Sequence, residues 1–243
     1  MSALQWLRSV LVALATTVLM TLAVVFMAVV RLVMLSGGRR FCAEVVARGV
    51  ARAFLWMAGV RVIVHRSGPF PEEQSIYTAN HSSTLDLFIL ISLGLPNTRY
   101  FMKRASWIVP PVGATGALIG TFFTPPQTMP AARARCFQAA ERKLRQTGDS
   151  VYLSPEGTRI TTGGIGPFNK GTFHLATNLG APIIPLFFAI PRSINPGKGA
   201  RSLPGTVHVH VLPAIPTKEW KLADLERNKE RVREVYLAFS RKA

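Results

Sequence analysis

The chain has 243 residues, of which 49% are hydrophobic, and its 29 basic and 12 acidic side chains give a formal net charge of +17. This length holds one domain with a short accessory segment, but not two full domains. So much positive charge indicates an acidic partner: a nucleic acid, an anionic membrane surface or a phosphorylated substrate. Because the sequence lacks both interleaved basic and aromatic residues and a base-reading motif, we expect no nucleic-acid partner.

A long uncharged stretch lies near the N-terminus. Residues 10–30 consist of Leu, Val, Ala, Met, Phe and three Thr, and Arg8 and Arg31 bracket them. As a helix, these roughly 21 residues would span about 30 Å, the thickness of a hydrocarbon core. A secretory signal peptide would have a shorter apolar stretch and a small-residue cleavage site. We therefore expect a retained membrane helix.

The next segment, residues 41–60, mixes Arg48 and Arg52 with apolar residues. This pattern favours a second helix with a basic side at the lipid–water interface, the alternative being an amphipathic helix of the core. We predict that residues 1–60 are a membrane anchor with interfacial helices. The positive-inside tendency then places the chain on the inner, cytoplasmic membrane, with residues 61–243 as an α/β domain facing the cytoplasm.

Beyond residue 60, short apolar runs alternate with longer helical segments. Alternation of this kind predicts an α/β fold, with a mostly parallel, mixed sheet flanked by helices. The predicted strands are residues 61–65, 75–79, 150–154, 182–189 and 207–212, and the predicted helices are residues 85–93, 131–146, 170–179 and 222–240.

Two polar residues follow the second of these strands. Asn80 and His81 fall at its carboxyl end, where open α/β sheets place their active sites. Asp86 lies in the first turns of the next helix and can fold back toward the imidazole. A carboxylate on one ring nitrogen stabilises imidazolium and leaves the other nitrogen to take a proton. The alternative is a structural histidine, with Asp86 serving only the helix dipole.

A second polar segment, Ser154-Pro155-Glu156-Gly157-Thr158-Arg159, follows another predicted strand. Gly157 permits close backbone approach, and Arg159 can hold a phosphate with two hydrogen bonds. Lys170 precedes a helix start, and Lys103 with Arg104 forms a further basic pair. Together with His81 and Asp86, these cations predict a pocket for a phosphorylated substrate. No metal site is predicted.

The order of Asn80–Asp86, Ser154–Arg159 and Pro182–Pro185 resembles the glycerol-phosphate and lysophosphatidate acyltransferases, the bacterial PlsC-like group. The resemblance implies that His81, oriented by Asp86, is the general base for a hydroxyl of a lysophospholipid acceptor. It also implies acyl-CoA or acyl carrier protein as donor, no cofactor, membrane lipids as partners, and substrate-binding roles for Glu156, Gly157, Thr158, Arg159, Lys103 and Lys170.

One departure from this family leaves the acceptor open. In this family, the second sequence motif, which lies between the His81 and Glu156 motifs, ends in an arginine. Here the corresponding segment begins at Lys103 and runs through Thr124 into Pro125 and Pro126, with no arginine at that place. A 1-acylglycerol-3-phosphate, giving phosphatidic acid, is the first expectation. The alternatives are a lysophospholipid with a larger headgroup, a lyso-aminolipid, or no catalysis at all, in a membrane protein that only binds anionic lipid.

Overall fold

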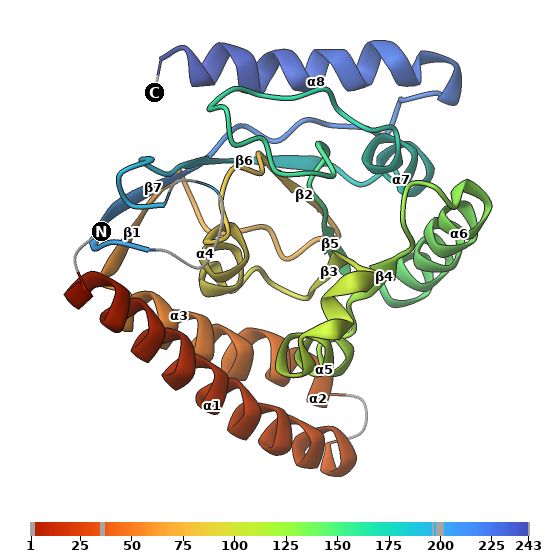
Figure 1. The fold of residues 1–243 in the computed structure, drawn as a ribbon. Coiled ribbons are helices and arrows are strands. Elements are labelled where there is room, and N and C mark those ends of the chain that lie inside the picture. Colours follow the sequence, from red (N-terminus) through yellow and green to blue (C-terminus); the bar gives the residue numbers. More distant parts are fainter. Residues whose placement is uncertain (1–2, 35–36, 196, 198–201, 243) are drawn as a thin grey trace.

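The computed structural model describes residues 3–34, 37–195, 197 and 202–242. One mixed sheet organises the domain (Figure 1), with the strand order β1-β7-β6-β2-β5-β3-β4. All neighbouring strands pair in parallel except β6 and β7. The strands are β1 (Val60–His65), β2 (Ile76–Ala79), β3 (Thr98–Lys103), β4 (Phe122–Thr124), β5 (Ser150–Tyr152), β6 (Ile183–Ala189) and β7 (Gly205–Val211). The predicted fold class is confirmed.

Helices cover both faces of this sheet. They are α1 (Ala3–Val33), α2 (Gly38–Phe41), η1 (Cys42–Ala47), α3 (Arg48–Met57), α4 (Asp86–Leu93), η2 (Arg104–Ile108), α5 (Pro110–Leu118), α6 (Pro130–Thr147), α7 (Gly171–Leu179), η3 (Leu222–Asp224) and α8 (Leu225–Ser240). In Figure 1, α7 and α8 lie on one side of the sheet and α4 on the other. The helices α1, α3 and α5 form a further layer beyond α4.

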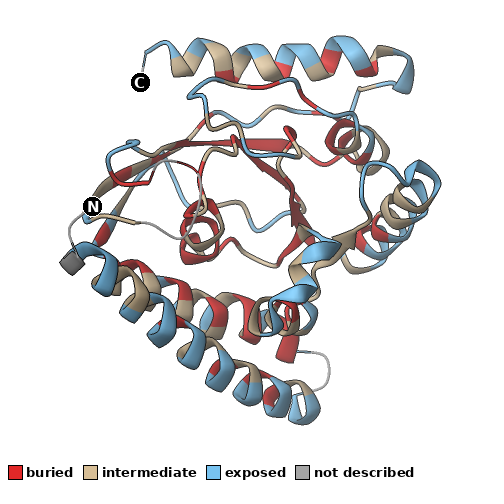
Figure 2. Cartoon of the chain, viewed as in Figure 1, coloured by how far each residue is buried: buried red, intermediate tan, exposed pale blue. Residues whose placement is uncertain are grey.

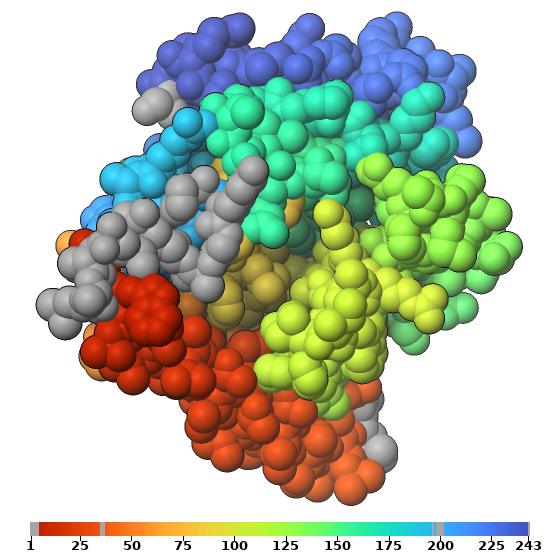
Figure 3. Space-filling view, in the orientation of Figure 1, coloured from red at the N-terminus to blue at the C-terminus, as the bar shows by residue number. Residues whose placement is uncertain are grey.

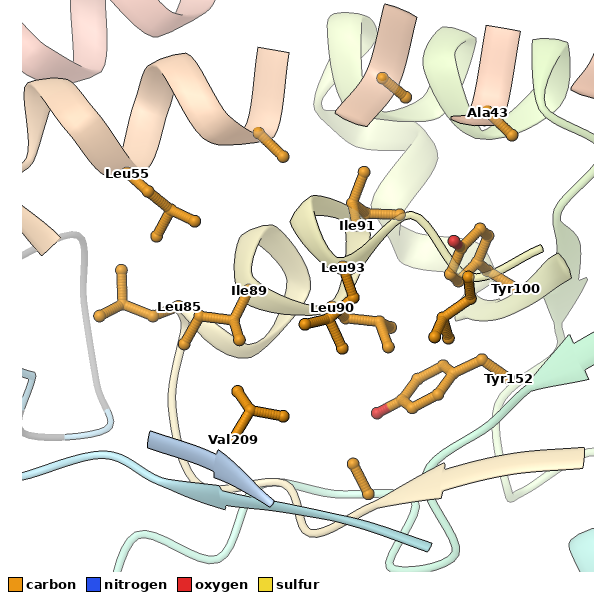
Figure 4. Packing of buried hydrophobic residues seen from close by; sticks show 14 of the residues in the cluster. Ala43, Leu55, Leu85, Ile89, Leu90, Ile91, Leu93, Tyr100, Tyr152 and Val209 are labelled. Atoms are coloured by element: carbon orange, nitrogen blue, oxygen red, sulfur yellow. The ribbon is translucent and has the colours of Figure 1, made fainter. Parts of the chain in front are cut away.

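The helix α4 lies at the centre of the larger apolar core. Its sequence, DLFILISL, is apolar on every side, as a helix enclosed by protein requires. Figure 4 shows Leu55 of α3 above α4 and Val209 of β7 below it. Residues of α1 and α3 belong to this same core, so the boundary predicted after residue 60, which falls at the start of β1, crosses a shared core.

The two strands β3 and β4 and the helix α5 were not among the predicted elements. Charged residues interrupt the apolar pattern of β3, TRYFMK, and β4 has only three residues. The α5 sequence, PPVGATGAL, contains two glycines, which lower helix propensity. Packing against α1 and Trp107 supports α5 instead, and this contact is not visible in a local pattern.

A buried carboxylate joins the N-terminal helices to the sheet. Asp149, just before β5, accepts hydrogen bonds from Arg39 of α2 at 2.8 Å and from Arg99 of β3 at 2.5 Å. Burial is the largest cause that lowers the pKa of Arg39, and Asp149 opposes it. Because removing one partner from such a group leaves a buried unpaired charge, Asp149 holds these three elements together.

Candidate active site

The site lies where β2 and β5 end. These strands pair in parallel, with Tyr77 opposite Tyr152, so the segments that follow them meet at one edge of the sheet. Backbone bonds join the two segments, since the amide of Ile160 donates to the carbonyl of His81 at 2.7 Å. Figure 3 shows a recess on this face, between α5 and the segment after β5, with atoms of α4 at its bottom.

Asn80 fixes the start of the loop that carries His81. Its Nδ2 donates to the carbonyl of Phe188 at 3.0 Å, and its Oδ1 accepts from the amide of Phe188 at 2.7 Å. Phe188 belongs to the neighbouring strand β6. The side chain therefore replaces a backbone pair of the sheet at the point where β2 ends, which aims the next residue out of the sheet.

His81 and Asp86 are in direct contact. Nδ1 of His81 and Oδ2 of Asp86 lie 2.7 Å apart, and this oxygen also accepts the amides of Ser82 at 2.8 Å and Ser83 at 3.0 Å. The Asp86 side chain is 3% exposed and that of His81 30%. The carboxylate keeps the neutral ring's proton on Nδ1, so Nε2 is left with its lone pair. Within the described residues, Nε2 has no hydrogen-bond partner.

Ser82 and Ser83, which precede α4, do not cap this helix with their side chains. The helix begins at Asp86, and its N-cap residue Leu85 makes no side-chain cap bond. Ser83 Oγ instead accepts the amide of Leu85 at 2.9 Å. The amides of Ser82 and Ser83, the first backbone donors before α4, are both bound to the Asp86 carboxylate.

Glu156 is buried and supports the His81 loop. Its Oε2 accepts the amide of His81 at 2.6 Å, and its Oε1 accepts the amide of Gly166 at 2.7 Å. Burial raises the pKa of Glu156, while these two amides act in the opposite direction. Both oxygens are thus engaged by the chain itself, which favours a role in positioning His81.

The remaining residues of this segment lie at the surface. Gly157 has φ +66°, and a Cβ there would lie 2.7 Å from Nδ2 of Asn169. Thr158 and Arg159 are exposed, and Nη1 of Arg159 lies 3.3 Å from the carbonyl of Gly197. Glycine is therefore required at position 157 by both space and backbone conformation, and Arg159 follows close to the His81 loop.

The two predicted lysines occupy different places. Lys103 is exposed at the end of β3, an edge of the sheet that it shares with the His81 loop. Lys170 is the N-cap of α7, and its Nζ lies 2.5 Å from Oε1 of Glu226 in α8. The structure therefore pairs Lys170 with a surface carboxylate, whereas Lys103 lies at the sheet edge where the site forms.

Another cation stands near the position where the arginine was expected. Nη1 of Arg133, in α6, donates to the carbonyl of Pro125 at 2.9 Å, just beyond β4. Gln127, two residues on, lies against Gly157. The connection from β4 to α6 is thus a neighbour of the segment with Arg159. A sequence pattern does not show this, because a helix turn brings Arg133 back to Pro125.

Two cavities adjoin the His81 loop and α4. One, of about 160 Å³, is lined by Ser82, Ser83, Thr161 and Arg192 among others. The second, of about 50 Å³, is enclosed by apolar side chains of α1, α3, α4, β3 and α5, including Met20, Leu87 and Phe88. Leu87 and Phe88 belong to the first turn of α4, directly after Asp86, so the apolar cavity and the His81–Asp86 pair share the start of this helix. In the described part of the chain, no three His, Cys, Asp or Glu side chains gather to hold a metal ion.

Known proteins share this sequence and architecture. The acyltransferase family model matches residues 61–189. Human 1-acyl-sn-glycerol-3-phosphate acyltransferase beta is 33% identical over 72% of this chain and 63% of its own length. The chloroplastic 1-acyl-sn-glycerol-3-phosphate acyltransferase BAT2 of Brassica napus is 31% identical over 66% of this chain and 46% of its own length. The chain thus spans about half to two thirds of these curated relatives.

A solved structure has the same fold. The crystal structure of the 1-acyl-sn-glycerophosphate acyltransferase PlsC from Thermotoga maritima superposes with a TM-score of 0.68. The match covers 93% of this chain and 95% of that one, at 21% sequence identity. The similarity includes the N-terminal helices, because so little of the chain lies outside it.

Proposed function

Since the chain belongs to the acyltransferase family, we propose that it transfers an acyl chain from a thioester to the free hydroxyl of a lysophospholipid. The observation that carries this proposal is the 2.7 Å contact of His81 Nδ1 with the buried Asp86 carboxylate. It leaves Nε2 as a base at the edge of the sheet where a substrate can reach it. A protein that only binds lipid has no need of such a pair.

The reaction follows from this arrangement. Nε2 of His81 takes the proton of the acceptor hydroxyl while its oxygen attacks the thioester carbonyl carbon. The imidazolium so formed is stabilised by Asp86. The tetrahedral intermediate then expels the thiolate, which takes the proton back from Nε2, and an ester and a thiol are released. The donor we propose is acyl-CoA or acyl carrier protein, and the step requires no acyl-enzyme.

The acceptor we propose is 1-acylglycerol-3-phosphate, the substrate after which the relatives are named. Arg159, Arg133 and Lys103 supply cations near the ends of β5, β4 and β3, and guanidinium groups suit phosphate oxygens. Lys170 contributes less to this proposal, because Glu226 already neutralises it. A lysophospholipid with a larger headgroup is the alternative acceptor.

The apolar cavity of about 50 Å³ next to Leu87 and Phe88 is the place we propose for the first methylenes of an acyl chain. It lies between α4 and the N-terminal helices, and its lining is almost wholly apolar. Apolar burial of this kind stabilises a hydrocarbon chain by about 0.8 kcal/mol per methylene. The chain would therefore lie along α4, with its carbonyl end toward Asp86 and His81.

We further propose that the protein works at a membrane, with the acyltransferase domain on the cytoplasmic side. The helix α1 is long and apolar enough to cross a bilayer by length and composition. One side of it packs on α3 and α5, whereas much of the rest is exposed (Figure 2). The exposed residues include large apolar ones, among them Leu11, Leu14, Val18 and Leu22. This exposed side would contact lipid, close to where the apolar cavity lies.

The test is an acyl-transfer assay of the purified protein with His81→Ala, using lysophosphatidate with acyl-CoA and with acyl carrier protein. We expect activity to fall by roughly 10²–10⁴-fold, while vesicle association is unchanged. His174→Ala is the matched control, because His174 is an exposed histidine of α7. Activity retained in His81→Ala would refute the mechanism, and a panel of lysolipids would identify the acceptor.

A further inference from the structure

A second, basic groove lies away from the active site. It has a volume of about 750 Å³ between α3, β1 and the end of α4. Its lining contains four arginines, Arg48, Arg52, Arg61 and Arg66, and one acidic residue, Glu72. Among the described residues, none of these four guanidinium groups forms a salt bridge. The groove is thus a concentration of positive charge that the protein itself leaves largely uncompensated.

Arg48 is the fixed part of this groove. Its Nε donates to the carbonyl of Ser92 at 3.3 Å, near the end of α4, and its guanidinium lies against Gly94. Burial lowers the pKa of Arg48, and the nearby charges of Arg52 and Arg66 lower it further. The positive charges of Arg48, Arg52 and Arg66 repel one another, so an anion bound between them would relieve this repulsion.

The groove is separate from the catalytic pair. Asp86 begins α4, whereas Ser92, Leu93 and Gly94 line the groove at its other end. Eight residues of helix correspond to about 12 Å. A ligand here would therefore not react at His81, and its binding is distinct from acyl transfer.

The surroundings of the groove are those of a membrane interface. Trp56 lines it and is 81% exposed. Arg8 of α1 donates to the carbonyl of Met57 at the end of α3, which places the N-terminal end of α1, with its exposed apolar residues Leu7 and Leu11, beside the helix that lines the groove. Tryptophan side chains concentrate at the headgroup level of bilayers, with basic residues drawn to the phosphates.

We propose that this groove binds the phosphate headgroup of an anionic phospholipid in the membrane that α1 enters. Arg48, held by Ser92, forms the inner wall, and Arg52 and Arg66 close on the phosphate from the exposed side. Trp56 lies beside the glycerol and the first methylenes of the lipid. An acidic protein such as acyl carrier protein would satisfy the charges but would leave the exposed Trp56 and α1 without an apolar partner.

The test uses the full chain and sedimentation with vesicles of phosphatidylcholine alone or of phosphatidylcholine with phosphatidylglycerol. The variant Arg52→Gln/Arg66→Gln removes two groove charges. The matched control, Arg142→Gln/Lys143→Gln, removes two exposed charges from α6, away from the groove and from α1. At roughly 1 kcal/mol per basic residue, we expect the groove variant to bind phosphatidylglycerol vesicles about thirtyfold more weakly. The control should change much less, and both should bind phosphatidylcholine as the wild type does.

Three results would overturn the proposal. Equal losses in the two variants would mean diffuse attraction, and no loss in the groove variant would mean that the groove is empty at the membrane. A loss of acyl carrier protein binding, with vesicle binding intact, would assign the groove to that protein. Glycerol phosphate, added as a soluble competitor, distinguishes binding of a lipid headgroup in the vesicle from binding of a free phosphate. Activity toward detergent-dissolved substrate should persist in both variants, so failure here is distinct from failure of the acyltransferase mechanism.

Discussion

Asp86→Asn isolates the charge of the carboxylate from its shape. In the variant, the amide oxygen can occupy the Oδ2 position and still accept from His81 Nδ1, Ser82 and Ser83. The amide nitrogen then takes the Oδ1 position, for which no partner exists among the described residues. The geometry of the loop is therefore kept, and the principal loss is the attraction between carboxylate and imidazolium as the proton is transferred.

The size of this loss follows from the distance. Unit charges 2.7 Å apart attract by about 6 kcal/mol at an effective dielectric constant of about 20, or roughly four decades of rate. His81 is partly exposed, so solvent reduces this value, and the retained hydrogen bonds return part of it. We expect kcat to fall by about 10²–10⁴-fold with little change in KM.

The assay is steady-state acyl transfer at saturating lysolipid, with a thermal melt of each variant. Asp86→Ala is the companion variant, because it removes the acceptor of the Ser82 and Ser83 amides as well. It should lower stability by about 1–3 kcal/mol for each amide left buried and unpaired. If Asp86→Asn keeps wild-type kcat, the carboxylate does not assist the base and the proposed pairing with His81 has no chemical role.

Three further changes test the supports of the site. Burial raises the pKa of Glu156, so its contribution to stability is full below the pKa of the unfolded chain and is lost as pH rises through the folded value. Urea unfolding across about pH 4 to 7 should therefore show a stability that varies less with pH in Glu156→Gln, and an unchanged slope would contradict the assignment. Gly157→Ala should destabilise the chain by about 1–3 kcal/mol, because φ is +66° and Asn169 blocks the added Cβ; a wild-type melting temperature would argue against this. Ala23→Phe narrows the apolar cavity and should shift donor preference toward shorter acyl chains in competition assays, whereas an unchanged preference would place the acyl chain elsewhere.

The sequence predicted the parts of the fold whose signals are local. The strands around residues 76–79 and 183–189 and the helix at residues 86–93 are confirmed, because apolar runs and bounding polar or glycine residues mark them. The acyltransferase family is confirmed too. The strands β3 and β4 and the helix α5 were missed, since long-range packing supports them rather than their own sequences.

The candidate site was predicted in part. The approach of Asp86 to His81 is confirmed as a contact, whereas the catalytic and substrate-binding roles of the named residues stay predictions. The pairing of Lys170 with Glu226 could not be foreseen, because the two residues are brought together only when α7 and α8 pack. The bond between Glu156 and the backbone of His81 could not be foreseen either, because the segments after β5 and β2 meet only when these strands pair.

The shared core of the N-terminal helices and α4 has a practical consequence for anyone who shortens this protein. Deleting residues 1–60 to improve solubility would strip α3 and η1 from α4 and leave Asp149 with one of its two arginines. The helix that presents Asp86 would then face solvent on an apolar side. A useful shortened protein would have to retain α2, η1 and α3, and polar substitutions would be confined to the exposed side of α1. The N-terminal helices and the helix that carries Asp86 therefore have to be engineered together.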